Sequence, residues 1–325
     1  MSKNIIVCCD GTGNEFGDRN TNVVKLFEII DKIPDKQIAY YDPGVGTFSA
    51  PGAITKTQKF ITKLFGLAFG YGITKNIEDA YEYLMDKYEE NDYVYLFGFS
   101  RGAFTVRALA GMLYKCGLLE KGSNNLIPYA TRMYRYKSES IAHGFKKTFC
   151  RECKPHFIGV WDTVKSVGII KSREFPNAVL NPDVNIGVQA LSIDENRRNF
   201  KPSLWEKVAD SNQYIRQVWF AGFHSDVGGS FEDSGLSDIA LKWIIDKASK
   251  NGLIINGDAF SALKPENVKG KMHNLLFPIW WLLGWTKREI INGSYVHKTV
   301  FERIDQLQSY KPKNLPKKED LIQAS

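Results

Sequence analysis

Ser100 lies in the sequence GFSRG, at the junction of two regular patterns. Residues 93–97 are aromatic and branched apolar residues, typical of a strand buried on both faces, and apolar residues recur at helical spacing over 103–113. A serine at so tight a strand-to-helix turn must take a strained backbone conformation. Glycine at Gly98 and Gly102 lets neighbouring backbone pass closely. The pattern predicts a nucleophilic serine at a strand end, facing a helix N-terminus that favours developing negative charge. A glycine-rich turn without chemistry is the alternative.

A serine nucleophile needs a base that takes its proton and a carboxylate that orients the base. Asp162 directly follows an apolar run, 156–161, that reads as a strand. His224 directly follows the next strong strand pattern, 217–223. Since both follow the serine in the order acid then histidine, and both stand at strand ends, the sequence predicts a triad with Ser100.

Two further residues stay open as members of this triad. Asp226 lies two residues beyond His224 and could orient it in place of Asp162. His297 follows an apolar segment and could fold back over Ser100 as the base. The spacing alone does not decide between these residues and the first pair.

An ester hydrolase also needs two backbone N–H groups that hold the developing oxyanion. One is expected from Arg101, the residue after the nucleophile. The other is expected from the loop after the first strand, where Gly11 and Thr12 follow Asp10. In this arrangement Asp10 holds the loop in place. The alternative is that Asp10, Gly11 and Thr12 form only a tight turn with a helix cap.

Metal-based chemistry finds less support in the sequence. Cys150, Cys153 and His156 are spaced as metal ligands, but they lack a fourth partner, so we expect neither a metal nor a cofactor. Asp10 with its Gly-Thr also suits a magnesium-dependent phosphatase. That class needs an attacking carboxylate two residues earlier, where this chain has Cys8.

The composition is that of a folded globular protein, with 325 residues, 43% hydrophobic and 24% charged. The net charge of +7 is modest, and we expect no nucleic-acid partner. Five cysteines, an odd number, do not indicate a disulfide framework. The N-terminus runs directly into a strand pattern, so we expect a protein that is cytoplasmic as synthesised. Membrane association, or delivery by a route that needs no signal peptide, remains compatible with this pattern.

The alternation of strand and helix patterns predicts an α/β fold, a mostly parallel sheet with helices on both faces. We expect one domain over 1–308, and within it a short helix at 190–197. The apolar segment LLFPIWWLLGW, from Leu275 to Trp285, is too short to span a bilayer. It is expected to pack in the core, or to belong to a segment around 265–300 that forms a lid over the active site or an interfacial anchor at a membrane surface. The lysine- and proline-rich end, 309–325, is expected to be a flexible basic tail.

Six blocks of the sequence resemble one family. They are CDGTGN at 9–14, YDPGVGT at 41–47, LFGFSRGA at 96–103, VWDTV at 160–164, ALSIDE at 190–195 and FAGFHSDVGG at 220–229. In this order they are similar to α/β-hydrolases of the long-uncharacterised family that includes the first family of type VI secretion lipase effectors.

The resemblance implies a serine esterase of the phospholipase A type, with Ser100, Asp162 and His224 at the matching positions. Its substrate would be a phospholipid or another ester. If the protein is an effector, an immunity or secretion partner is implied as well. Secreted members are usually longer than this chain. A non-catalytic module on the same scaffold, binding a membrane or a partner, and a metal-dependent phosphate-ester hydrolase remain alternatives.

Overall fold

A parallel sheet of eight strands organises the part of the molecule that the structure describes. The computed structural model describes residues 2–11, 17, 19–44, 68–164, 180–206, 212–263, 267–274 and 284–325. The strand order is β10-β9-β8-β7-β6-β3-β1-β2, and every neighbouring pair is parallel. The strands are β1 Asn4–Cys9, β2 Gln37–Asp42, β3 Tyr93–Phe99, β6 Pro155–Trp161, β7 Ile186–Ser192, β8 Tyr214–Phe220, β9 Tyr295–His297 and β10 Ile322–Ala324. A separate antiparallel pair joins β4 Leu118–Leu119 to β5 Cys150–Arg151.

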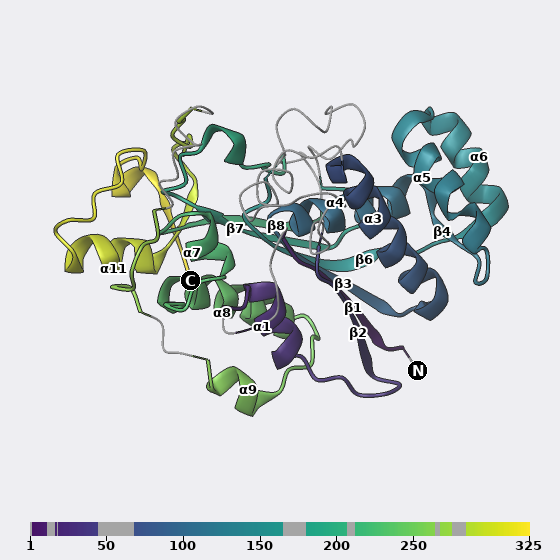
Figure 1. Cartoon of the computed structure of the whole chain (residues 1–325), viewed down its shortest axis with the longest axis horizontal. Helices are drawn as coiled ribbons and strands as arrows, with labels where there is room; N and C mark the ends of the chain where they lie inside the picture. Colours follow the sequence, from purple (N-terminus) through teal and green to yellow (C-terminus); the bar gives the residue numbers. More distant parts are fainter. Residues whose placement is uncertain are drawn as a thin grey trace, which may run out of the picture.

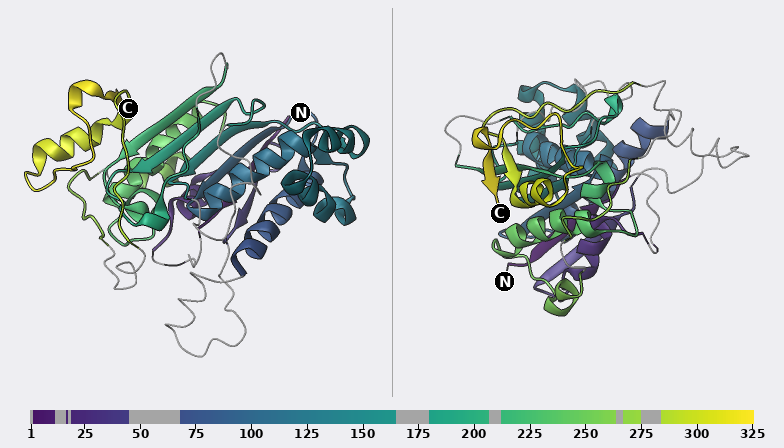
Figure 2. Two further views of the ribbon diagram at one scale, coloured as in Figure 1. Left: turned by 90° about the horizontal axis from the view of Figure 1, so that it is seen from above. Right: turned by 90° about the vertical axis from the view of Figure 1, so that its left-hand side faces the viewer.

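Helices lie on both faces of this sheet (Figures 1 and 2). The α-helices are α1 Asn22–Ile29, α3 Ala68–Lys87, α4 Arg101–Cys116, α5 Ile127–Tyr136, α6 Glu139–Phe149, α7 His224–Gly228, α8 Gly235–Ser249, α9 Gly257–Ser261 and α11 Lys298–Gln306. Short 3-10 turns follow at Asn124–Leu126, Arg198–Phe200 and Lys318–Asp320. The fold is therefore the predicted α/β class, a parallel sheet between helical layers. No helix in these described ranges is long and apolar enough to cross a membrane.

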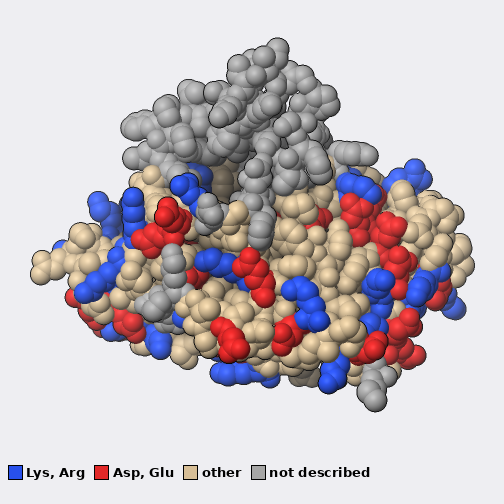
Figure 3. All heavy atoms as spheres, turned by 60° about the horizontal axis from the view of Figure 1, so that its bottom comes forward, with Lys and Arg blue, Asp and Glu red and all other residues tan. Residues whose placement is uncertain are grey.

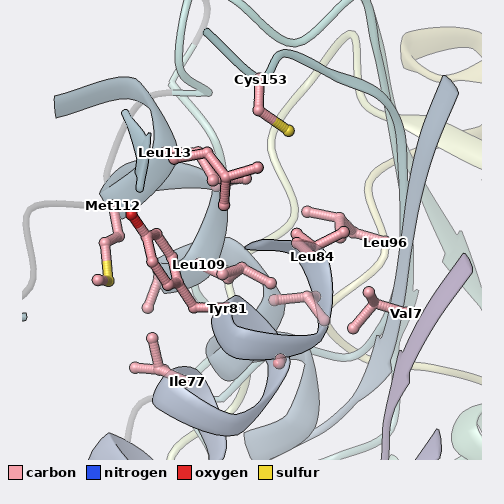
Figure 4. Close-up of a cluster of buried hydrophobic side chains, with 14 of the residues drawn as sticks. Val7, Ile77, Tyr81, Leu84, Leu96, Leu109, Met112, Leu113 and Cys153 are labelled. Carbon is pink, nitrogen blue, oxygen red and sulfur yellow. The ribbon is translucent and has the colours of Figure 1, made fainter. Parts of the chain in front are cut away.

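Two apolar cores hold these layers to the sheet because successive strand residues point to opposite faces. On one face, Val7 and Leu96 pack against α3 and α4, through side chains such as Tyr81 and Leu109 (Figure 4). On the other face, the alternate residues of the same strands pack against α1 and α8. Strands buried on both faces explain why these segments read as continuous apolar runs.

Two sequence-based expectations about regular elements are corrected by the structure. Residues 190–197 do not form a helix, because 186–192 is the strand β7, buried between β6 and β8. The predicted strand 217–223 is β8, and it ends at Phe220, three residues earlier. His224 then begins the short helix α7.

The C-terminal segment is also different from the flexible tail that its composition suggested. Strand β10 pairs in parallel with β9 and completes the edge of the sheet. The N–H of Gly293 donates to the carbonyl of Asp320, and that of Ile322 donates to Ser294, at 2.7 and 3.0 Å. These long-range backbone bonds outweigh the local preference of a charged, proline-containing segment.

Charged side chains of both signs are interspersed on the face shown in Figure 3, without a continuous field of one sign. The helices α11 and α5–α6 lie at opposite ends of the sheet (Figure 1).

The central strands of the sheet lie between these two ends. Their carboxyl ends form the edge at which ligands bind in sheets of this kind.

A glycine substitution tests how tightly α4 is pressed against this edge. A Cβ built on Gly102 would lie 2.0 Å from the carbonyl oxygen of Cys9 and 2.5 Å from that of Asp10. We expect Gly102→Ala to lower the free energy of unfolding by about 1–3 kcal/mol, because two backbone segments must separate. Gly144→Ala in α6 is the matched control. No atom lies within 4 Å of its added Cβ.

The control variant should gain stability, by up to about 1 kcal/mol, because alanine is the better helix former. Urea unfolding of the two variants and the wild type measures both effects. Equal stability of the Gly102→Ala variant and the wild type would contradict the close approach.

Candidate active site

Ser100 occupies a strained turn between β3 and α4. Its backbone angles are φ 57° and ψ −115°, a conformation that residues with a side chain rarely adopt. Its N–H donates to the carbonyl of Trp161 at 3.0 Å, which ties the turn to the end of β6. A Cβ on Gly98 would lie 2.6 Å from the backbone carbonyl of Gly102. The two glycines are therefore required by the turn that presents the serine hydroxyl.

Ser100, His224 and Asp162 form one chain of hydrogen bonds. The Nε2 atom of His224 lies 2.8 Å from the Oγ atom of Ser100. Its Nδ1 atom lies 2.6 Å from Oδ2 of Asp162. An ionised carboxylate can only accept, so Nδ1 carries the proton and Nε2 accepts from the serine hydroxyl. This is the geometry by which a neutral imidazole can act as a base toward a hydroxyl.

The carboxylate of Asp162 is fully buried and has four further hydrogen bonds. Arg288 donates to Oδ1 at 2.5 Å and to Oδ2 at 2.9 Å, and the backbone N–H and hydroxyl of Ser192 donate at 2.9 and 3.1 Å. Burial alone would raise the pKa of Asp162. The charge of Arg288 and the bonds to His224 and Arg288 outweigh it and hold the pKa well below its usual range. Asp162 therefore stays ionised behind the histidine.

The imidazole of His224 contacts two phenyl rings. The ring centroid of Phe99 lies 4.7 Å away, and that of Phe200 lies 5.0 Å away at 78°. Burial lowers the pKa of His224, and the hydrogen bond and charge of Asp162 raise it less than burial lowers it. The ring is therefore kept neutral, as a base requires, at neutral pH.

A second ion pair lies beside the histidine. Glu195 accepts from Nε and from a terminal nitrogen of Arg197 at 2.8 and 2.6 Å. The backbone N–H of His224 donates to Glu195 at 3.3 Å, so this carboxylate contacts the main chain of the histidine. The charge of Arg197 lowers the pKa of His224, and that of Glu195 raises it. The charged groups that act on the imidazole thus come from the segments that follow β6 and β7.

The two open alternatives are engaged elsewhere. The Oδ1 atom of Asp226 lies 2.7 Å from Nδ1 of His273, and Oδ2 accepts from the N–H of Phe223 at 2.9 Å. The Nδ1 atom of His297 lies 2.8 Å from the hydroxyl of Thr299, and the imidazole ring stacks on Phe220. Burial lowers the pKa of His297 to about 4. The structure therefore joins His224, and not His297, to Ser100, and Asp162, and not Asp226, to His224.

The loop expected to complete the oxyanion site is only partly described. Thr12 lies outside the described residues. The N–H of Gly11 donates to the carboxylate of Asp10 at 2.6 Å, so this donor is already committed. Asp10 also accepts from Thr21 at 2.6 Å and from Tyr41 at 3.0 Å, which fits its expected supporting position. Arg101 directly follows Ser100, and its N–H is the first backbone N–H of α4.

Other sequence candidates lie in different settings. Within the described part of the chain, no three His, Cys, Asp or Glu side chains gather as metal ligands would. His156 contacts the carbonyl of Asn251, and burial raises the pKa of the Cys153 thiol. Most of the apolar segment, 275–283, lies outside the described residues. Trp285, at its end, forms an isolated bridge with Arg197.

Two residues that hold Asp162 were not predicted from the sequence. Ser192 ends β7, in a block that was predicted to be a helix. Arg288 lies 126 positions from Asp162, and no local pattern marks it. A buried aspartate implies a nearby cationic partner, but it does not indicate which of 43 lysines and arginines supplies it.

Removal of the Arg288 charge should change the pKa of His224 in the folded protein. In Arg288→Gln the negative charge of Asp162 is no longer neutralised, so it attracts a proton on His224 more strongly. We expect the pKa of His224 to rise. Arg288→Lys, which keeps the charge, is the matched control and should shift it less. NMR titration of the His224 ring measures the pKa, and an unchanged value in Arg288→Gln would contradict this coupling.

Known proteins and solved structures that are similar to this chain were found by comparison. A yeast protein described as uncharacterised (Saccharomyces cerevisiae, strain ATCC 204508 / S288c) is 37% identical over 218 residues, which are 61% of this chain and 32% of that protein. Two solved structures share 18% identity. One is an uncharacterised protein from Pseudomonas aeruginosa (TM-score 0.48, covering 81% of this chain and 48% of that one). The other is the Tle1 effector bound to the VgrG spike of the type VI secretion system (TM-score 0.35, 71% and 51%).

The chain thus spans about a third to a half of the length of these relatives. A family model also matches this chain. The model describes the catalytic domain of Tle1-like phospholipase effectors of the type VI secretion system and matches residues 3–247. The chain belongs to this Tle1-like catalytic-domain family.

Proposed function

We propose that the protein is a serine esterase that cleaves carboxylic esters of phospholipids. The observation that carries the proposal is the chain of hydrogen bonds from Ser100 Oγ through His224 to Asp162, at 2.8 and 2.6 Å. The conformation of Ser100 adds to it, because strain of this kind is expected where a turn must present a nucleophile.

The proposed reaction begins with attack of Ser100 Oγ on the ester carbonyl. As the new C–O bond forms, the hydroxyl proton passes to Nε2 of His224, and the carbonyl oxygen takes up the negative charge. The N–H of Arg101 is the proposed donor to that oxygen. His224 then returns the proton to the leaving alcohol. Water, activated by the same ring, releases the acid from Ser100 and restores the hydroxyl.

Asp162 has two functions in this scheme. It fixes the tautomer of His224 by accepting from Nδ1, and its negative charge stabilises the imidazolium that forms during attack. Arg288 and Ser192 hold the carboxylate in place. Preorganisation of this kind lowers the barrier because little has to reorient as charge develops.

The phospholipid substrate is supported by the family, whose matched model describes a phospholipase effector domain. The triad geometry supports ester cleavage of any kind. Cleavage at an acyl ester, the phospholipase A type, suits a serine nucleophile because the acyl carbonyl is the electrophile that such a triad attacks.

Replacement of the nucleophile tests the reaction directly. Ser100→Ala should reduce release of fatty acid from a phospholipid panel, read by mass spectrometry, by at least about 10³-fold, because no covalent intermediate can form. It should also lose labelling by a fluorophosphonate probe. The exposed Ser261, replaced by alanine, is the matched control and should keep wild-type activity and labelling. Full activity of Ser100→Ala, or loss of turnover on chelation alone, would contradict the proposal.

A second set of variants separates the triad from its alternatives. Asp162→Asn should lower kcat by about 10⁴-fold, since an amide neither fixes the tautomer nor stabilises the imidazolium. His297→Gln and Asp226→Asn should change kcat by much less, because the hydrogen bonds of these side chains go to Thr299 and to His273 and Phe223. Steady-state kinetics on a short-chain ester measure these three variants together with His224→Gln, with circular dichroism to verify folding. A larger loss in His297→Gln than in His224→Gln would make His297 the base.

The acid limb of kcat/KM provides an independent check on the wild type. Because burial lowers the pKa of His224, the base remains neutral below the usual pKa of about 6.5. We expect kcat/KM to stay level from neutral pH to about 6.5 and to fall only at lower pH, as His224 becomes protonated. A fall that begins well above pH 7 would contradict a buried, neutral histidine as the base.

A further inference from the structure

A groove lies on one face of the sheet, next to the candidate active site. On this face α4 packs against β1, β3 and β6. Over β7 and β8 the cover includes two loop segments, 197–205 and 286–294, which line the groove together with strand residues. Its volume is about 970 Å³, at the upper end of the range of small-molecule sites.

The floor of the groove is apolar and firmly held. Trp219 and Leu191 are register partners on β8 and β7, and Ile215 precedes them on the same face of β8. Trp205 comes from the first loop. Gln217 accepts from its N–H at 2.7 Å and donates to its carbonyl at 2.9 Å, so the loop is fixed to β8 and the polar groups of the glutamine are satisfied. These floor side chains are therefore apolar apart from Gln217, whose amide is engaged by the first loop.

Apolar side chains also stand at the mouth. Leu204 is 42% exposed and Ile291 is 65% exposed, and they belong to the two different loops. Single exposed apolar residues are common on protein surfaces. Two that line one groove extend its apolar surface outward to solvent.

The rim of the groove is positively charged. Arg198, Lys201 and Lys287 are exposed lining residues, and their side chains have no ion pair or hydrogen bond to any residue of the described ranges. Glu289 is the acidic residue among those that line it. Three cations against one carboxylate favour a ligand with a negative charge at the mouth of the groove.

We propose that this groove binds the anion of a long-chain fatty acid. The chain would lie along Trp205, Ile215 and Trp219, and the carboxylate would lie at Arg198 and Lys201. An apolar channel with a cationic mouth matches a ligand that is apolar except for one charged end.

This site goes beyond the proposed hydrolysis. Neither Ser100 nor His224 lines the groove, so binding there needs no turnover. Arg288 and Phe200 do line it, and they contact Asp162 and the ring of His224. A bound fatty acid would thus be separated from Asp162 and His224 by one layer of side chains, Arg288 and Phe200. It would lie nearer to Asp162 than to Ser100 along the chain of hydrogen bonds.

Two tryptophans in the floor allow a direct test with 9,10-dibromostearate, whose bromine atoms quench indole fluorescence on contact. We expect saturable quenching in the full-length chain, and equal affinity in Ser100→Ala, so that the result does not depend on the proposed chemistry. The double variant Arg198→Gln/Lys201→Gln should bind at least tenfold more weakly. Leu204→Asp, which places a negative charge at the mouth, should weaken binding by a similar factor.

The matched control is Lys121→Gln/Lys147→Gln, which removes two exposed lysines on the other side of the molecule, near β4 and in α6. Its affinity should stay within twofold of the wild type. Stearyl alcohol, which lacks the charge, should compete poorly. An equal loss in control and rim variants, no saturable quenching below the aggregation concentration of the fatty acid, or binding confined to anionic phospholipid vesicles would overturn the proposal.

Discussion

The buried carboxylate of Asp162 is the constraint on which the site depends. A charge taken out of water is costly unless hydrogen bonds and opposite charge replace its hydration. Here the replacement comes from Arg288, Ser192 and His224 together. These donors belong to three segments far apart in the sequence, so the carboxylate is satisfied only when β7, α7 and the segment before β9 are all in place. The orientation of His224 is therefore a consequence of the complete fold.

The part of the chain beyond the family match has a direct share in this arrangement. The match ends at residue 247, and Arg288 lies outside it. The segment that carries Arg288 is held at both ends. The N–H of Thr286 donates to the carbonyl of Asn196 at 2.7 Å, and β9 pairs with β8. The apolar contacts of β9 and α11 with Leu191 and Trp219 then fix the edge of the sheet. The C-terminal strands thus support the electrostatics of the catalytic candidates as well as the fold.

Local patterns were sufficient for the elements that the site is built on. The turn around Ser100 could be predicted because glycine at 98 and 102 and the flanking apolar periods are all local properties. Asp162 and His224 could be predicted because buried parallel strands are continuous apolar runs, and polar residues follow where they end. All three lie at the ends of elements that the sequence specifies strongly.

The residues that were missed depend on long-range contacts. Strand β7 looked helical because its last residues merge with the polar turn after Ser192, and only pairing on both sides makes it a strand. The end of the chain looked flexible because its composition is basic and polar, while β10 is ordered through pairing with β9. The partnership of Arg288 with Asp162 is of the same kind. Tertiary contacts override weak local preference in each case.

Arg288 also sets a balance between two requirements of the proposed chemistry. A positive charge on the far side of Asp162 makes burial of the carboxylate tolerable, but it weakens the attraction of that carboxylate for an imidazolium. The low pKa of His224 favours the neutral base before attack, and the short bond from Nδ1 to Asp162 remains to stabilise the ring once it is charged. The same arginine lines the groove over β7 and β8. A ligand there that broke the two hydrogen bonds from Arg288 to Asp162 would leave the carboxylate charge less neutralised, and Asp162 would then attract the imidazolium of His224 more strongly. The guanidinium group of Arg288 thus links the groove to the triad, and through it a ligand bound in the groove would alter the charge balance at His224.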